Sequence, residues 1–62
     1  MKLSELLDVI VNGSEIRVFE YDTEQTLYKG LNLESATELT KFESRKVVYV
    51  ARSGPGIRIG LA

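Results

Sequence analysis

The sequence contains no cysteine and no histidine, and both absences restrict its chemistry. Disulfides are excluded, and a zinc-type site would lack its two principal ligand types. The commonest general base and the thiol nucleophile are also missing, so catalysis would need paired carboxylates or an activated lysine. We therefore expect a protein that is not an enzyme and that uses no metal and no cofactor.

Long apolar runs are absent as well. The longest one, residues 47–51, has five residues, whereas a membrane-spanning helix needs about 20. Glu5 and Asp8 interrupt the segment that would have to form an apolar secretion signal. These features predict no membrane contact and a cytoplasmic location.

The chain is short, with 62 residues, and we expect a single domain over residues 1–62. A chain of this size buries only about 60% of the surface that it exposes when unfolded, so its stability is expected to be marginal. Without disulfides or metals, the remaining reinforcement is association. We expect either a homodimer or docking on a partner.

Acidic residues are absent after residue 43. Residues 1–44 contain nine acids and four bases, a net charge of −5, whereas residues 45–62 contain four bases and no acid, a net charge of +4. The total of −1 therefore hides a strongly polarised chain. Such segregation informs on partners and on electrostatic steering, although not on fold.

The first half of the sequence predicts a helix followed by a β-hairpin. Apolar residues recur at helical spacing, which places them on one stripe of a helix; they are Leu3, Leu6, Leu7, Ile10 and Val11. Ser4 is the expected N-cap, and Gly13 is expected to end the helix. Residues 15–21 and 26–31 are rich in β-branched and aromatic residues and flank a polar turn. In the first of these strands, Ile16 and Val18 share one face, and Phe19 and Tyr21 share the other with Arg17.

The second half predicts another helix and another hairpin. A capping box, Ser35 with Glu38, favours a short helix over about residues 36–43. Residues 45–52 are continuously apolar in the middle, which is typical of a central strand that is buried on both faces. Residues 57–61 alternate, with Arg58 and Gly60 facing outward. The predicted fold class is α+β, in the order α-β-β-α-β-β, with an antiparallel sheet of two hairpins packed against one or two short helices.

The tip of the first hairpin is one candidate site. Its acidic residues, with two tyrosines beside them, would mimic nucleic acid in a basic groove of a partner protein; the candidate residues are Glu20, Tyr21, Asp22, Glu24 and Tyr28. The alternative is structural: the charges protect an edge strand against aggregation. A cation site at the same tip would also need glycine and carbonyl ligands at fixed places, so we expect no metal there.

The second hairpin turn is the other candidate site. Arg52 and Arg58 flank a turn in which the amides of Gly54 and Gly56 could hold a phosphate-like anion. The alternative is that this segment is only a turn. The basic tail, with Tyr49 for stacking, would also suit single-stranded nucleic acid, but a sequence pI near 5.3 argues against direct nucleic-acid binding.

The overall layout resembles small, cysteine-poor accessory proteins of bacteriophages and prophages of Gram-positive bacteria. The resemblance rests on residues 1–7, on the segments 16–19 and 26–30, and on residues 47–50. It implies a protein of the host bacterial cytoplasm that binds a host protein without an active site of its own. A CRISPR effector nuclease is the candidate partner, as for anti-CRISPR proteins, whose target reads its flanking motif with basic side chains.

Two other classes of function stay open at this point. An oligomeric protein could sequester a nucleotide-like anion at the Arg52–Arg58 loop, and a structural or assembly module would have neither activity.

Overall fold

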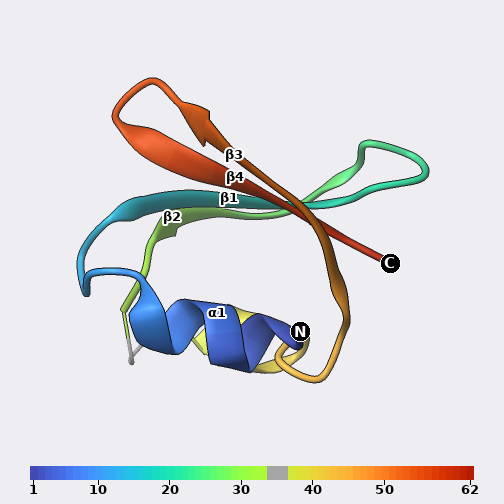
Figure 1. Cartoon of the computed structure of the whole chain (residues 1–62), viewed down its shortest axis with the longest axis horizontal. Coiled ribbons are helices and arrows are strands. Elements are labelled where there is room, and N and C mark those ends of the chain that lie inside the picture. Colours follow the sequence, from blue (N-terminus) through green and yellow to red (C-terminus); the bar gives the residue numbers. More distant parts are fainter. Residues whose placement is uncertain (34–36) are drawn as a thin grey trace.

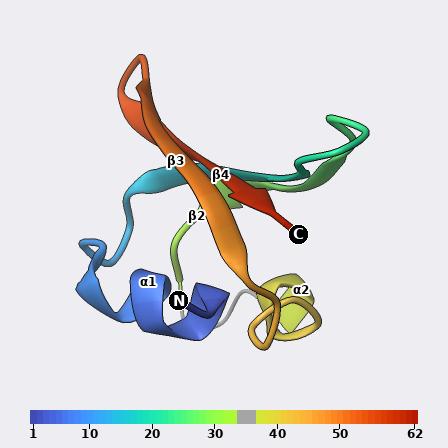
Figure 2. The ribbon, with the colours of Figure 1, turned by 45° about the vertical axis from the view of Figure 1, so that its right-hand side comes forward.

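The computed structural model describes residues 1–33 and 37–62, and its elements follow the predicted order. They are α1 (Leu3–Val9), β1 (Glu15–Glu20), β2 (Thr26–Leu31), α2 (Thr37–Thr40), β3 (Val47–Ser53) and β4 (Gly56–Leu61). Both helices lie on the same side of a four-stranded sheet (Figures 1 and 2). Within the described residues, no helix is long and apolar enough to cross a membrane.

The sheet has the strand order β2-β1-β4-β3. Each hairpin is antiparallel, as the sequence predicts, but the two hairpins join through parallel pairing of β1 with β4. The α+β class is thus confirmed, whereas the sheet is mixed rather than antiparallel throughout. Parallel pairing places the alternating strand β4 in the centre, where its apolar side chains extend those of β1.

The expectation that residues 45–52 form a central, doubly buried strand is wrong. They contribute to β3, which is an edge strand of the sheet. Val50 pairs with Ile59 and so faces the helices, yet it remains 51% exposed, and Val48 is 44% exposed. The apolar run therefore reflects β propensity at an edge rather than burial.

The core lies between the helices and the two central strands. Its buried members come from α1, α2, β1 and β4, and they are Leu3, Leu39, Ile16, Val18, Ile59 and Leu61. Most of the predicted apolar stripe of the first helix packs against this core. Val11 does not: α1 ends at Val9, and Val11 is 76% exposed.

The N-terminal end of α1 is fixed by distant main-chain groups. The helix begins two residues earlier than predicted, so Lys2, and not Ser4, is the N-cap. The free amides of Leu3 and Ser4 donate to the main-chain oxygens of Arg45 and Glu43, at 2.9 and 3.0 Å. These bonds replace the side-chain cap that the sequence predicts.

Beyond the other end of α1, Gly13 adopts φ +89°, the left-handed conformation expected of it, and its amide donates to the main-chain oxygen of Asn32. The expected second helix is shorter than predicted, since α2 covers Thr37–Thr40. The predicted capping box involves Ser35, which lies outside the described residues.

Candidate functional site

One face of the sheet carries no helix in the described part of the chain (Figure 2). Side chains alternate between the two faces along a strand. In β1, Ile16 and Val18 are buried toward the helices, so Arg17 and Phe19 point to the face without helices. Tyr21, just after β1, continues the same alternation. We call this surface the outer face.

Three cationic side chains stand side by side on the outer face. Lys29 of β2 is the register partner of Arg17 of β1, and Arg17 is the partner of Arg58 of β4. Neighbouring strands lie about 4.8 Å apart, so these residues form a line of about 10 Å across three strands. We call Lys29, Arg17 and Arg58 the cationic row.

The cationic row is not neutralised within the described residues, where no carboxylate lies within ion-pair distance of its three members. The guanidinium group of Arg17 instead donates to the hydroxyl of Thr26, at 3.0 and 3.3 Å. The acidic residue on this face, Glu15, lies two positions before Arg17. Like charges directly opposite one another destabilise a sheet. The cationic row therefore lowers the stability of the fold, and a bound anion would offset this effect.

An aromatic cluster, composed of Phe19, Tyr21 and Tyr49, adjoins the cationic row. The ring centres of Phe19 and Tyr49 are 5.8 Å apart in an edge-on arrangement, and those of Tyr21 and Tyr49 are also 5.8 Å apart. Phe19 is 4% exposed, whereas Tyr21 and Tyr49 are 49% and 36% exposed. Two rings therefore present surface to solvent above a buried third ring.

Gly60 and Arg58 of β4 set the position of these rings. A Cβ atom at Gly60 would lie 3.0 Å from side-chain atoms of Tyr21 and Tyr49 and 3.1 Å from Phe19, so any other residue there would have to displace these rings by a few tenths of an ångström. The guanidinium carbon of Arg58 lies 5.1 Å from the ring centre of Phe19, within the range of a cation–π contact. This contact joins the cationic row to the aromatic cluster.

A groove of about 460 Å³ lies at the end of the sheet where β1 begins. Arg17 and Lys29 form part of its wall, together with Glu15, Leu31 and Ser53 of the second hairpin. Two members of the cationic row therefore border a concave surface.

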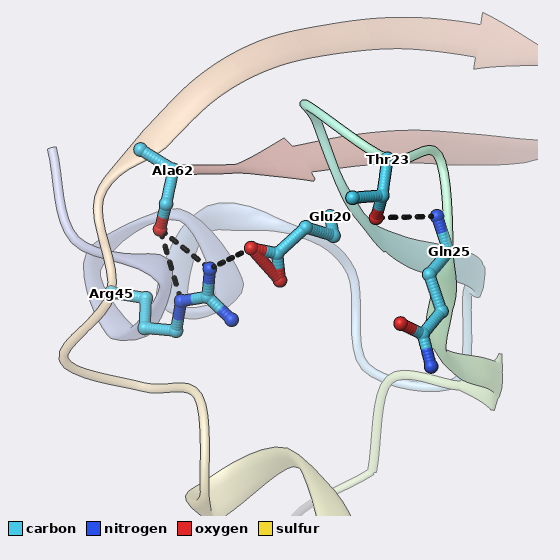
Figure 3. Close-up of polar contacts among 5 residues, drawn as sticks. All are labelled: Glu20, Thr23, Gln25, Arg45 and Ala62. Atoms are coloured by element: carbon cyan, nitrogen blue, oxygen red, sulfur yellow. Dashed lines mark hydrogen bonds and ion pairs between the residues drawn. The ribbon is translucent and has the colours of Figure 1, made fainter.

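The predicted acidic site is not brought together as a unit. Glu20 accepts a hydrogen bond from the guanidinium group of Arg45 at 3.1 Å, and Arg45 also donates to the main-chain oxygen of Ala62 (Figure 3). Asp22 and Glu24 are exposed in the turn, where Glu24 adopts φ 60°, an uncommon conformation for a residue other than glycine.

The two tyrosines of that predicted site lie on opposite faces. Tyr21 belongs to the aromatic cluster on the outer face. Tyr28 is the register partner of Val18 and faces the helices, and its hydroxyl donates to the main-chain oxygen of Leu31 at 2.7 Å.

The predicted anion site is also divided between the faces. Arg58 pairs with Ala51 on the outer face, whereas Arg52 pairs with Ile57 and points to the helix side. Gly54 adopts φ +56° in the turn, and a Cβ at Gly56 would lie 2.6 Å from the main-chain oxygen of Glu15. Both glycines thus have structural reasons to be present. In residues 1–33 and 37–62, no group of three acidic side chains is placed to hold a metal ion.

Sequence reasoning did not identify Arg17, Phe19, Lys29 or Tyr49 as members of one site. The signal was partly available, since alternation places Arg17 with Phe19 and Tyr21 and turns Arg58 outward. The missing information was the parallel pairing of β1 with β4, which aligns Arg17 with Arg58.

No family model, no curated protein and no solved structure matches this chain.

Proposed function

We propose that this chain is a binding protein without catalytic activity and that it engages an anionic partner through the outer face of its sheet. The observation that carries the proposal is the cationic row, in which Lys29, Arg17 and Arg58 lie on adjacent strands without a carboxylate partner in the described part of the chain. A bound anion would relieve the mutual repulsion of the row and supply charge-assisted hydrogen bonds.

The positions of the acidic side chains also favour the outer face as the surface that binds an anion. The acidic side chains of the turn, Asp22 and Glu24, lie in the loop that extends past the sheet (Figure 1). Glu20 is engaged with Arg45. The net charge of −1 is therefore compatible with a local positive surface, although Glu15 lies on the same face, two positions before Arg17. Complementary charge of this kind raises association rates and disfavours wrong partners.

Retention on immobilised heparin, a polyanion, tests the proposal. The variant Arg17→Gln/Lys29→Gln removes two charges from the cationic row, and we expect it to elute at clearly lower salt than the unaltered protein. The matched control, Lys2→Gln/Lys41→Gln, removes the same charge from exposed positions outside the row. Equal loss of retention in the two variants, or no retention of the unaltered protein, would overturn the proposal.

A second candidate function is the inhibition of a host-defence nuclease, as the resemblance to phage accessory proteins implies. The exposure of Asp22 and Glu24 at a projecting turn favours it, since an acidic projection fits a basic motif-reading cleft. Glu20 is not available for this role while it is paired with Arg45.

DNA cleavage by a Cas9-type nuclease, measured with and without the protein, tests this second candidate. We expect stoichiometric inhibition that Asp22→Lys/Glu24→Lys abolishes. Glu20 is left unchanged, so that the fold retains its ion pair with Arg45. Inhibition that survives both charge reversals, or the absence of inhibition, would exclude the acidic turn as the inhibitory surface.

A further inference from the structure

The exposed rings of the aromatic cluster indicate which kind of anion fits the outer face. We infer that the outer face binds single-stranded nucleic acid, with phosphates on the cationic row and unpaired bases on Tyr21 and Tyr49. This inference rests on the proposed function and specifies its ligand.

The spacing of the two groups supports this ligand. Phe19 follows Arg17 by two residues on β1, and Gly60 follows Arg58 by two residues on β4. The aromatic cluster is therefore displaced from the cationic row by two residues along the strands, on the same face. This displacement is about 7 Å. A flexible nucleotide strand can therefore place its backbone on one group while its bases reach the other.

The exposure of the rings suits stacking. Phe19 is 4% exposed and lies beneath the two tyrosines. Its ring centre is 6.4 Å from that of Tyr21 and 5.8 Å from that of Tyr49. The two tyrosines present the accessible ring surface. Sites that bind single strands combine a positive track with aromatic platforms, and stacking tolerates any base because every base has a π face.

A duplex fits less well, because its base faces are already stacked and cannot reach the tyrosines. An acidic protein partner would use the cationic row and can also pack on tyrosines, which are enriched at protein interfaces. What favours a single strand is that its unpaired bases can stack on both rings while its phosphates meet the cationic row.

The charge of the site predicts the strength of its salt dependence. Three phosphate contacts give a slope of about −2 for log Kobs against log salt, at about −0.7 per contact for single strands. We expect the slope to become shallower by about 0.7 in Lys29→Gln and by about 1.4 in Arg17→Gln/Lys29→Gln. The remaining acidic surface of the chain keeps the affinity modest at physiological salt.

Fluorescence anisotropy with a labelled 12-nucleotide oligothymidine, a 12-nucleotide oligouridine and a 12-base-pair duplex tests the inference. We expect both single strands to bind more tightly than the duplex, and the two single strands together separate a DNA ligand from an RNA ligand. Tyr21→Leu keeps apolar cover over Phe19 but removes a ring. It should weaken single-strand binding by about 5- to 150-fold, the equivalent of one stacked base.

Intrinsic tyrosine fluorescence gives a second measurement on the same samples, because the chain has no tryptophan. Stacked bases should quench the emission of the unaltered protein, and part of the quenching should disappear in Tyr21→Leu. Circular dichroism identifies any variant that fails to fold, and Tyr28→Phe, on the helix side, is the matched control.

The outcomes distinguish the inference from the proposed function. Retention on heparin that depends on Arg17 and Lys29, without binding of either oligonucleotide, would overturn the inference and leave the proposed function standing. Binding that is equally tight for single strands and duplex, or unchanged in folded Tyr21→Leu, would also overturn the inference. Absence of binding to every polyanion would overturn both.

Discussion

Arg17 and Arg58 are direct register partners on the parallel strands β1 and β4, so their side chains project from the outer face next to each other. Lys29 extends the line on β2. The contact of Arg58 with Phe19 and the hydrogen bonds of Arg17 to Thr26 hold two of the three cations over the sheet surface. The cost of their mutual repulsion leads to a prediction about stability.

Removing one cation from the row should stabilise the fold at low ionic strength. We expect Lys29→Gln to raise the free energy of unfolding by about 0.2–0.5 kcal/mol, because it removes a like charge opposite Arg17. The gain should shrink as salt screens the row. Urea denaturation at about 10 mM and 300 mM salt measures both effects. Lys41→Gln is the control, and an equal gain in the control would refute the repulsion.

A side chain at Gly60 should destabilise the fold. The added Cβ of Gly60→Ala would lie 3.0–3.1 Å from three aromatic residues, and we expect a loss of about 1–3 kcal/mol from overpacking. Gly30→Ala is a matched comparison, because its Cβ would lie 2.9 Å from the hydroxyl oxygen of Tyr28, the far end of one side chain, whose displacement costs one hydrogen bond to Leu31, whereas Gly60 is surrounded by three rings. Thermal unfolding of both variants measures the difference. A loss in Gly60→Ala no larger than that in Gly30→Ala would contradict the packing of rings over this position.

Asn32 should contribute to stability through the C-terminal end of α1. Its side-chain amide donates to the main-chain oxygens of Leu7 and Ile10, at 3.3 and 3.2 Å, and the residue is 8% exposed. Asn32→Ala leaves both oxygens without this donor, so we expect a loss of about 1–3 kcal/mol. Chemical denaturation measures it, with the exposed Asn12→Ala as the control, for which a change within about 0.5 kcal/mol is expected. Equal effects at the two positions would show that the amide is unimportant.

Arg45 should stabilise the chain through Glu20 and Ala62. Arg45→Met removes the 3.1 Å ion pair and two hydrogen bonds to the main-chain oxygen of Ala62, at 2.7 and 3.0 Å. Both ionic side chains are about 30% exposed, so we expect a loss of about 1–2 kcal/mol. A double-mutant cycle with Glu20→Gln isolates the pair. Additive effects of the two substitutions would mean that the pair itself contributes nothing.

Local patterns in the sequence were sufficient for much of the fold. Helical periodicity located α1 to within a few residues. Alternation grouped the residues of β1 by face and assigned the inner and outer sides of β4. Both patterns depend on neighbours in the chain, but which face of β1 packs against the helices was left open. The N-cap was missed because the amides of Leu3 and Ser4 are satisfied by Arg45 and Glu43, about 40 positions away.

Strand order was the part that local patterns did not determine. The apolar run of residues 47–51 predicted a central strand, yet β4, with its cleaner alternation and its glycine at position 60, occupies the centre. The same gap explains the candidate site. The register of the first hairpin places Lys29 beside Arg17, but only the pairing of β1 with β4 adds Arg58 to them.

A nuclear magnetic resonance titration tests the central claim most directly. Amide shifts of ¹⁵N-labelled protein, followed during addition of the 12-nucleotide oligothymidine, report which surface meets the ligand. We predict that the largest changes map to Arg17, Phe19, Tyr21, Lys29, Tyr49, Arg58 and Gly60, with little change in α1. Changes concentrated on the helices or on the turn at residues 22–24, or no changes at all, would contradict the assignment of the outer face as the binding surface.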